Sequence, residues 1–245
     1  MAFTNQKMQR LEHTDLSRKG AIDDALVELV HFINANAKYF TTSSCSGRII
    51  VFQNQSETVK KKGCQWLYVS HVPVEFEAIE KSLENITDEA VFKFEPMVMH
   101  IQCQDLESAQ KLHQAAVASG FRNSGITIGS KGKIMMAVRG THSLEAPLSS
   151  KGQVLVTQQY IKYLIESANS KMEENFCRIN RFYEQVKSLS VSTNSSKMKK
   201  SHGIKSKTKT YTNNKPIEDN KTIDNSRDVF EEDEKNLSLF MFDST

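Results

Sequence analysis

The chain lacks the glycine-rich loops with which many enzymes bind nucleotides. Its 245 residues include only 10 glycines, and these form neither a GxGxxG nor a GxxxxGKS/T sequence. Such sequences let the backbone approach the phosphates of a nucleotide closely. Their absence argues against a Rossmann dehydrogenase, a nucleotide-dependent kinase and the commonest methyltransferase fold, each of which uses a glycine-rich turn.

Paired cysteines and long apolar runs are missing too. The four cysteines form no CxxC pair, so we expect neither a structural zinc site nor another bound metal. No apolar run reaches the roughly 18 residues of a membrane-spanning helix, and the N-terminus has no apolar run of signal-peptide length. We therefore expect a cytoplasmic protein without a membrane partner, whose cysteines are reduced. They are Cys45, Cys64, Cys103 and Cys177.

Charge is nearly balanced over the whole chain but is segregated near its end. The 32 lysines and arginines and the 29 acidic residues give a net charge of +3, which neither requires nor excludes a nucleic acid partner. Six lysines without an acid occupy residues 197–209, and nine acids occupy residues 218–243. Because this segment buries too little apolar surface to fold alone, we predict one domain over residues 1–190 and a disordered charged tail over 191–245. The lysine cluster is interpreted as a solvated tail, an RNA-phosphate site or a nuclear signal.

Hydrophobic periodicity predicts both helices and strands. Apolar residues recur at helical spacing in some segments, and others show alternation or short β-type runs. This pattern predicts an α/β or α+β fold of non-Rossmann type, a single domain whose mixed β-sheet is covered by helices, with a long C-terminal helix. The expected helices cover residues 22–36, 74–84, 105–120 and 157–188, and the expected strands cover 48–53, 64–70, 91–95, 97–103, 125–129 and 133–139.

The most unusual segment is Tyr39–Arg48, which concentrates hydroxyls, a thiol and an arginine behind two aromatic residues. We interpret it as a polar loop at the end of the apolar strand 48–53, a position where proteins often present functional side chains. Two interpretations stay open at this point, a site of chemistry or a turn whose hydroxyls only cap backbone groups. The candidate residues are Ser43, Ser44, Cys45, Ser46, Gly47 and Arg48.

Further candidates lie at strand ends and in one turn. His71 follows the strand 64–70 and can act as a base or bind a phosphate, while His100 lies on the more polar side of its strand. For both, the alternative is a structural hydrogen bond. Trp66 can stack on a base or fill the core. Cys45 can act as a nucleophile with either histidine as its base. A helix-terminating turn adds Arg122, Asn123 and Ser124, and the next strand ends at Arg139.

Five motifs follow one another along the chain. They are Asp15–Asp23, Tyr39–Arg48, Trp66–His71, Phe92–Pro96 together with His100, and Gly120–Ile126. In this order they resemble the wybutosine-synthesising family of tRNA methyltransferases, specifically the member that acts third in that pathway. The resemblance extends over about three quarters of the chain and leaves out the tail.

This resemblance implies a methyl transfer that depends on S-adenosylmethionine. The substrate would be the hypermodified guanosine beside the anticodon of phenylalanine tRNA, tRNA(Phe), after its tricyclic base has received an aminocarboxypropyl arm, and a ring nitrogen would be methylated. The cofactor would lie on Ser43–Arg48, with Arg48 holding its methionyl carboxylate. His71 and His100 are candidate catalytic bases, and other enzymes of the pathway are candidate partners. The substrate would contact Trp66, Arg122, Asn123, Ser124 and Arg139.

Two functions of other classes stay open. One is a non-catalytic RNA-binding or scaffold protein that has the same fold, and the other is a thiol-dependent enzyme that uses Cys45. Cofactor binding separates the first from an enzyme. A conservative Cys45→Ser change separates the second from a methyltransferase.

Overall fold

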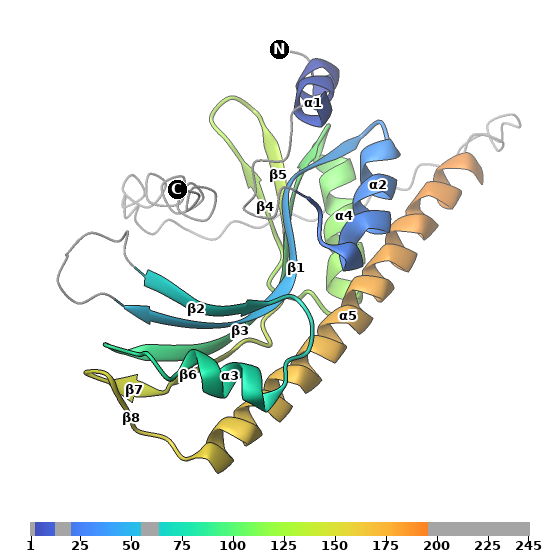
Figure 1. Cartoon of the computed structure of the whole chain (residues 1–245). Coiled ribbons are helices and arrows are strands. Elements are labelled where there is room, and N and C mark those ends of the chain that lie inside the picture. The colour runs from blue at the N-terminus through green and yellow to red at the C-terminus, as the bar shows by residue number, and fades with distance from the viewer. Residues whose placement is uncertain (1–2, 13–20, 55–63, 196–245) are drawn as a thin grey trace, which may run out of the picture. The chain divides into compact units, whose positions relative to one another are not determined.

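The computed structural model describes residues 3–12, 21–54 and 64–195. Residues Met1–Ser192 form one compact unit, which contains the sheet and the helices packed on it (Figure 1). The charged tail predicted over residues 191–245 lies outside the described residues except for the end of the last helix. No helix among the described residues is long and apolar enough to cross a membrane.

One antiparallel sheet organises this unit. Its strands follow the order β2-β1-β3-β5-β4, and β6 pairs with the first half of β3. The two longest strands, β1 and β3, lie in the middle and pair along most of their length. The strands are β1 (Tyr39–Asn54), β2 (Cys64–Ser70), β3 (Ala90–Cys103), β4 (Gly125–Ile128), β5 (Ile134–Arg139) and β6 (Leu144–Pro147), and a separate pair comprises β7 (Ser149–Ser150) and β8 (Gln153–Val154).

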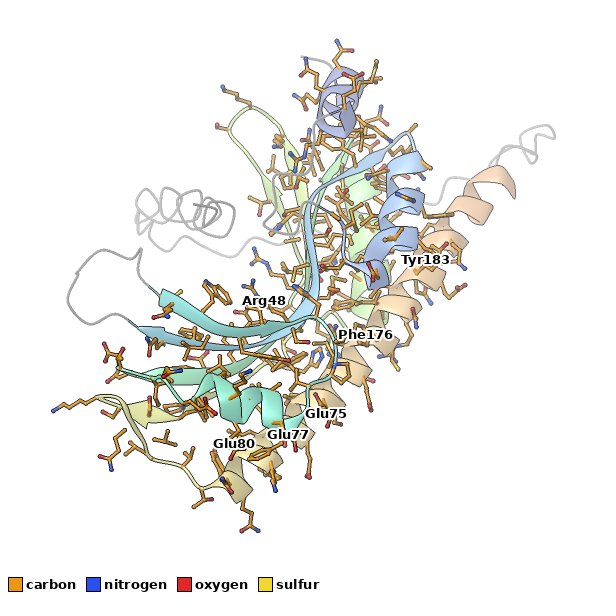
Figure 2. All side chains as sticks on the ribbon, viewed as in Figure 1. Arg48, Glu75, Glu77, Glu80, Phe176 and Tyr183 are labelled. Carbon is orange, nitrogen blue, oxygen red and sulfur yellow. The ribbon has the colours of Figure 1, made fainter. Side chains whose placement is uncertain are left out.

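Helices cover one face of the sheet through two buried apolar clusters. The first cluster packs α2, α4 and the second half of α5 against one half of the sheet, and the second packs α3 and the first half of α5 against the other. Phe176 of α5 contacts both clusters (Figure 2), so a single helix holds both halves. The helices are α1 (Phe3–Glu12), the 3-10 helix η1 (Asp24–Leu26), α2 (Val27–Ala35), α3 (Phe76–Ser82), α4 (Leu106–Ala118) and α5 (Gln158–Ser195).

The structure confirms the predicted fold class and most predicted elements. The four expected helices correspond to η1 with α2, α3, α4 and α5, and the expected strands 125–129 and 133–139 correspond to β4 and β5, which pair as a hairpin. Asp105 caps α4 by accepting a hydrogen bond from the Ser108 N–H at 2.7 Å, and Gly120 follows this helix with φ of 101°. Because every described ladder is antiparallel, the fold is α+β.

Two predictions about local structure were wrong. The segment Tyr39–Arg48, expected as a loop, is the first part of the 16-residue strand β1. The expected strands 91–95 and 97–103 form one strand, β3, which continues through Pro96. Both errors have the same cause. The strands β1 and β3 stabilise each other through pairs of residues that lie far apart in the sequence, and strand formation depends strongly on such cross-strand neighbours. The helix α1 and the strand β6 were not predicted.

The strands β1 and β3 share an irregularity at their centre. Side chains alternate with a period of two in a regular strand, yet the buried Ser46 and Ile49 on β1 are three residues apart, as are Phe94 and Met97 on β3. At this point Gly47 has φ of 100°, a value that favours glycine. The chain therefore bends here, where the two halves of the sheet meet (Figure 1).

Asn175 of α5 binds the backbone groups at this bend. Its side chain is completely buried. The Nδ2 atom donates to the Ser46 carbonyl at 2.6 Å, and the Oδ1 atom accepts from the Met97 N–H at 2.8 Å. A buried polar backbone group without a partner costs roughly 1–3 kcal/mol. Asn175 thus stabilises the bend and fixes α5 to both central strands.

We expect Asn175→Ala to lower the free energy of unfolding by about 2–5 kcal/mol, because two buried backbone groups lose their partner at once. Urea denaturation measures this change. Asn169→Ala is the matched control, since Asn169 binds the N–H and the carbonyl of Val74, each at 2.9 Å, but is only half-buried. Water can replace that side chain, so its loss should be clearly smaller. Equal losses in the two variants would contradict the role assigned to Asn175.

Candidate functional site

The segment Ser43–Arg48 lies in the middle of β1, at the bend. Ser43 pairs with His100 of β3, and Cys45 lies two residues further along on the same face. This face lies opposite the two apolar clusters, and α1 covers one end of it, where Gln6 accepts a hydrogen bond from Gln102 and Phe3 contacts Phe40. We call it the open face. Ser46 points toward the helices and is 1% exposed. Its side chain therefore does not reach a molecule bound on the open face, and Ser46 acts only through its backbone groups in the bend.

His100 and Ser43 form a pair on the open face. The Ser43 hydroxyl lies 2.9 Å from His100 Nδ1. Burial, together with the positive charge of Arg139 on the adjacent strand, lowers the pKa of His100 below its ordinary value of 6.5. The ring is therefore neutral at pH 7, and its buried Nε2 has no partner among the described residues. A neutral imidazole of this kind can accept a proton or orient the serine hydroxyl.

His71 follows β2, which pairs with the edge of β1 opposite to β3, and it reaches the bend from that edge. Its Nδ1 atom lies 3.0 Å from the Gly47 carbonyl and 3.4 Å from Asp23 Oδ2. The same Asp23 oxygen accepts a hydrogen bond from the Ser46 N–H at 2.8 Å. Because a carbonyl oxygen can only accept, a hydrogen bond between His71 and Gly47 requires the proton on Nδ1. The other ring nitrogen, Nε2, then has a free lone pair and can act as a base.

Cys45 lies close to this group but does not complete a catalytic triad. Its Sγ atom is 3.9 Å from His71 Nδ1, the same nitrogen that contacts Asp23 and Gly47. In a relay the thiol and the carboxylate would face different nitrogens of the ring. Burial also raises the pKa of the Cys45 thiol above 9.0, which disfavours the nucleophilic thiolate.

The same three side chains are close enough to be considered as metal ligands. One ligand atom from each of Asp23, Cys45 and His71 lies within 4.8 Å of the others. A metal needs a deprotonated histidine nitrogen and a thiolate. In the structure Nδ1 of His71 lies at hydrogen-bond distance from the Gly47 carbonyl, 3.0 Å, and burial raises the pKa of Cys45, so a metal would have to displace that contact and deprotonate the thiol. The arrangement therefore fits a hydrogen-bonded base better than a metal centre.

Arg48, labelled in Figure 2, is held on the open face by a carboxylate and an indole ring. Its Nε donates to Glu95 Oε2 at 2.8 Å, and its guanidinium carbon lies 4.8 Å from the centre of the Trp66 ring. Burial alone would raise the pKa of Glu95, but Arg48 and Lys93 lower it, so the carboxylate stays charged. Trp66 itself packs against Phe52 with ring centres 6.5 Å apart. The terminal Nη atoms of Arg48 have no hydrogen bond within the described chain.

The predicted substrate-binding turn is only partly connected to these groups. The Ser124 hydroxyl accepts from the Arg139 N–H at 3.1 Å, and its carbonyl lies 3.1 Å from His113 Nε2. Arg139 lies on the strand next to β3 and influences His100. Arg122 and Asn123 are exposed in the turn after α4, and no contact joins them to the bend within the described residues.

Sequence reasoning assigned no role to three residues that shape the site. Asp23 was noted only as the last residue of a motif that carries the family resemblance. Glu95 lies in another such motif, opposite Arg48 on the neighbouring strand. Asn175 interrupts the apolar stripe of α5 between Met172 and Ile179, and a polar residue at a core position is the signal that would have revealed it.

The neutral state of His100 gives stability a measurable pH dependence. Its pKa is lower in the folded protein than the ordinary 6.5, so below that pH the unfolded chain binds a proton that the folded protein does not. The contribution of neutral His100 to the free energy of unfolding is complete above about pH 6.5 and is lost as the pH falls. We expect the wild type to lose more free energy of unfolding from about pH 7.5 to about pH 5.5 than His100→Gln does.

Urea denaturation at both pH values tests this difference. The pKa of His142 is lowered as well, by burial and by Arg178, but that residue is unchanged in both proteins and cancels in the comparison. His31→Gln is the matched control, because His31 is exposed on α2, and it should keep the wild-type loss. If His100→Gln also kept that loss, the neutral assignment of His100 would be wrong.

Comparison with known proteins identifies relatives along most of the chain. The family model "Methyltransferase TYW3" matches residues 4–188. A relative from Danio rerio named "tRNA wybutosine-synthesizing protein 3 homolog" is 53% identical over 185 residues, which cover 75% of this chain and 74% of the relative. A Homo sapiens relative of the same name is 50% identical over 183 residues, which cover 74% and 71%.

A solved structure has the same fold. The PH1069 protein from Pyrococcus horikoshii matches with a TM-score of 0.67 at 28% identity, over 75% of this chain and 93% of that protein. The family resemblance suggested by the five motifs is therefore confirmed, and this chain belongs to the TYW3 family of methyltransferases.

Proposed function

We propose that this protein transfers a methyl group from S-adenosylmethionine to a ring nitrogen of the tricyclic wybutosine precursor beside the anticodon of tRNA(Phe). Membership of the methyltransferase family and relatives named for wybutosine synthesis support this proposal. The observation that carries it in the structure is the grouping of His71, His100, Ser43 and Arg48 around one bend of β1. Within the family, these residues give the chain what a methyl transfer requires.

Methyl transfer depends on alignment and on removal of a proton. S-adenosylmethionine supplies an electrophilic methyl group. The chain must hold the accepting nitrogen in line with it, exclude water and take up the proton that the nitrogen loses. The free lone pair of His71 Nε2 is the best-prepared acceptor for that proton. His100, neutral and bonded to Ser43, is the second candidate.

Arg48 fits the amino acid end of the cofactor. Its Nε is held by Glu95, whereas its Nη atoms can form paired hydrogen bonds with a carboxylate. The remaining residues of Ser43–Gly47 contribute a hydroxyl and the glycine backbone for the rest of the cofactor. Glu95 and Trp66 keep the guanidinium in place, so little side-chain entropy is lost on binding.

The substrate would approach the open face. Trp66 offers an aromatic surface for a base, and Arg139, Ser124, Arg122 and Asn123 would contact the base or its arm. The opposite side is less suited to RNA near α3, because Glu75 at the helix start and Glu77 and Glu80 on the helix (Figure 2) would repel phosphates. The lysines there, Lys81 on α3 and Lys162 over the Phe76 ring, offset these charges only in part.

The pathway context also suggests partners. An Arabidopsis thaliana relative named "tRNA wybutosine-synthesizing protein 2/3/4" is 38% identical over 186 residues, which cover 69% of this chain but 19% of that protein. The name and length of that relative support the proposal that this protein works beside other enzymes of the pathway. Such work on tRNA would take place in the cytoplasm.

Of the two other functions considered, the geometry favours neither. A thiol-dependent enzyme is opposed by the raised pKa of Cys45 and by the sharing of one histidine nitrogen. A non-catalytic scaffold would not need the paired arrangement of Arg48, Glu95 and Trp66 on the open face. The Cys45→Ser variant separates a thiol-dependent enzyme from a methyltransferase, and a measurement of cofactor binding separates a scaffold from a methyltransferase.

The direct test is methyl transfer in vitro. Phenylalanine tRNA from cells that lack this protein is incubated with the purified protein and labelled S-adenosylmethionine, and the modified nucleoside is analysed by mass spectrometry. We expect a gain of one methyl group on the tricyclic base. Cys45→Ser should retain this activity. No transfer to any tRNA, despite a folded protein, would contradict the proposal.

Arg48→Ala should weaken cofactor binding by roughly 2–4 kcal/mol, because a carboxylate would lose its partly desolvated partner. Isothermal titration calorimetry measures the affinity. Arg181→Ala is the matched control, since Arg181 forms an ion pair with Glu174 on α5 and lies outside the site. Equal affinity in Arg48→Ala and the control would remove Arg48 from the cofactor site.

We also expect the compact unit to suffice for the chemistry. No candidate residue lies beyond Arg139, and the last buried residue described on α5 is Val186. A chain that ends at Ser192 should therefore methylate at the wild-type rate at saturating tRNA and low salt. Its tRNA affinity should depend less steeply on salt, because the six lysines of 197–209 no longer displace counterions from RNA.

The matched control for this truncation is the full chain with the same six lysines changed to glutamine. It should reproduce the weaker salt dependence. A truncated chain that folds by circular dichroism and binds cofactor, but does not methylate, would contradict this division between domain and tail.

A further inference from the structure

Asp23 belongs to a motif that the proposed chemistry leaves without a role. It directly precedes η1, but its side chain makes no capping hydrogen bond to that helix. The carboxylate is instead turned toward β1, and its side chain is only 11% exposed. A helix-start function therefore does not explain this acidic residue.

The carboxylate of Asp23 contacts the strand bend and His71 with one oxygen. Oδ2 accepts from the Ser46 N–H at 2.8 Å and lies 3.4 Å from His71 Nδ1. The Gly47 carbonyl lies 3.0 Å from the same Nδ1. Two acceptors thus surround this nitrogen, and neither can donate to it. Both are satisfied only when Nδ1 carries a proton.

Such an environment selects one tautomer of the imidazole ring. A carboxylate that holds the distal nitrogen of a histidine fixes the orientation of the ring and stabilises the positive charge that appears when the other nitrogen takes up a proton. Here the other nitrogen is Nε2, and the side chain of His71 is 33% exposed. Access for a substrate and support from a carboxylate therefore coexist at one residue.

We infer that Asp23 is a positioning residue that holds His71 in the Nδ1–H tautomer, with Nε2 ready to accept the proton released during methyl transfer. The catalytic part of this inference rests on the proposed function. The tautomer does not, since it follows from the contacts of Nδ1 with the Asp23 carboxylate and the Gly47 carbonyl. Asp23 also accepts the Ser46 N–H, so it ties the orientation of the base to the bend that carries the cofactor segment.

The first experiment needs no variant. Nitrogen-15 correlation spectra of the imidazole rings, recorded over a series of pH values up to about pH 8, report which nitrogen of each histidine carries the proton. His71→Asn assigns the signal. We expect the Nδ1–H form for His71 in the wild type. The Nε2–H form would overturn the inference, as would a stoichiometric metal in the purified protein, because a metal on Nδ1 would replace the proton.

The second experiment uses Asp23→Asn, which removes the charge but keeps an oxygen that can accept the Ser46 N–H. Circular dichroism checks the fold. We expect a mixture of tautomers at His71 and a kcat reduced about ten- to hundredfold, as for other residues that orient a functional histidine. The KM for tRNA should stay within about twofold, because Asp23 contacts no substrate.

Asp24→Asn is the matched control, since it makes the same charge change at the exposed neighbouring position, and it should leave tautomer and kcat at wild-type values. Asp23→Asn with the wild-type tautomer and kcat would overturn the inference. If the wild type and both variants all fail to transfer a methyl group, the proposed function is wrong. In that case the tautomer spectra still test whether Asp23 positions His71.

Discussion

The hydrogen bonds of Asn175 are the interaction on which the rest of this structure depends. Two halves of one sheet can share the helix α5 only if β1 and β3 bend between them. The bend needs a partner for the Ser46 carbonyl and the Met97 N–H, and a single buried amide supplies both. Asp23 binds the N–H of the same Ser46 from the opposite side. One residue of β1 is thus fixed through both of its backbone polar groups by residues that come from two distant parts of the chain.

The chemistry of the open face follows from this bend. Side chains alternate between the two faces of a regular strand, and the bend shifts this alternation by one residue. As a result Ser43 and Cys45, which precede the bend, and Arg48, which follows it, point toward the same face. The left-handed conformation of Gly47 also turns its carbonyl toward His71. A Cβ atom at Gly47 would meet Asn175 Nδ2 and the Glu95 carbonyl at 3.0 Å each, so glycine is required for steric as well as conformational reasons.

The sequence was most informative where structure is determined by near neighbours. Helix α4, with its Asp105 cap and its Gly120 terminator, and the β4–β5 hairpin could be predicted because their signals lie within a few residues. The strand β1 could not, because Ser, Thr and Gly are typical of loops and only pairing with β3 makes them a strand. The candidate residues were identified by type, but their partners were not. The pairs Ser43 with His100 and Arg48 with Glu95 join residues 57 and 47 positions apart.

The position of Asn175 in the chain has a consequence for how the protein folds during synthesis. The hydrogen bond from Asn175 to Ser46 spans 129 residues, whereas every candidate site residue lies at or before Arg139. A ribosome therefore releases the whole set of candidate residues before it has made the helix that fixes their arrangement. Contacts over such separations form slowly because the chain must first close a long loop. Until α5 is complete, the bend of β1 lacks its partner and the apolar face of the sheet is covered only by α2, α3 and α4. The nascent chain at this stage therefore exposes apolar surface that promotes aggregation and degradation.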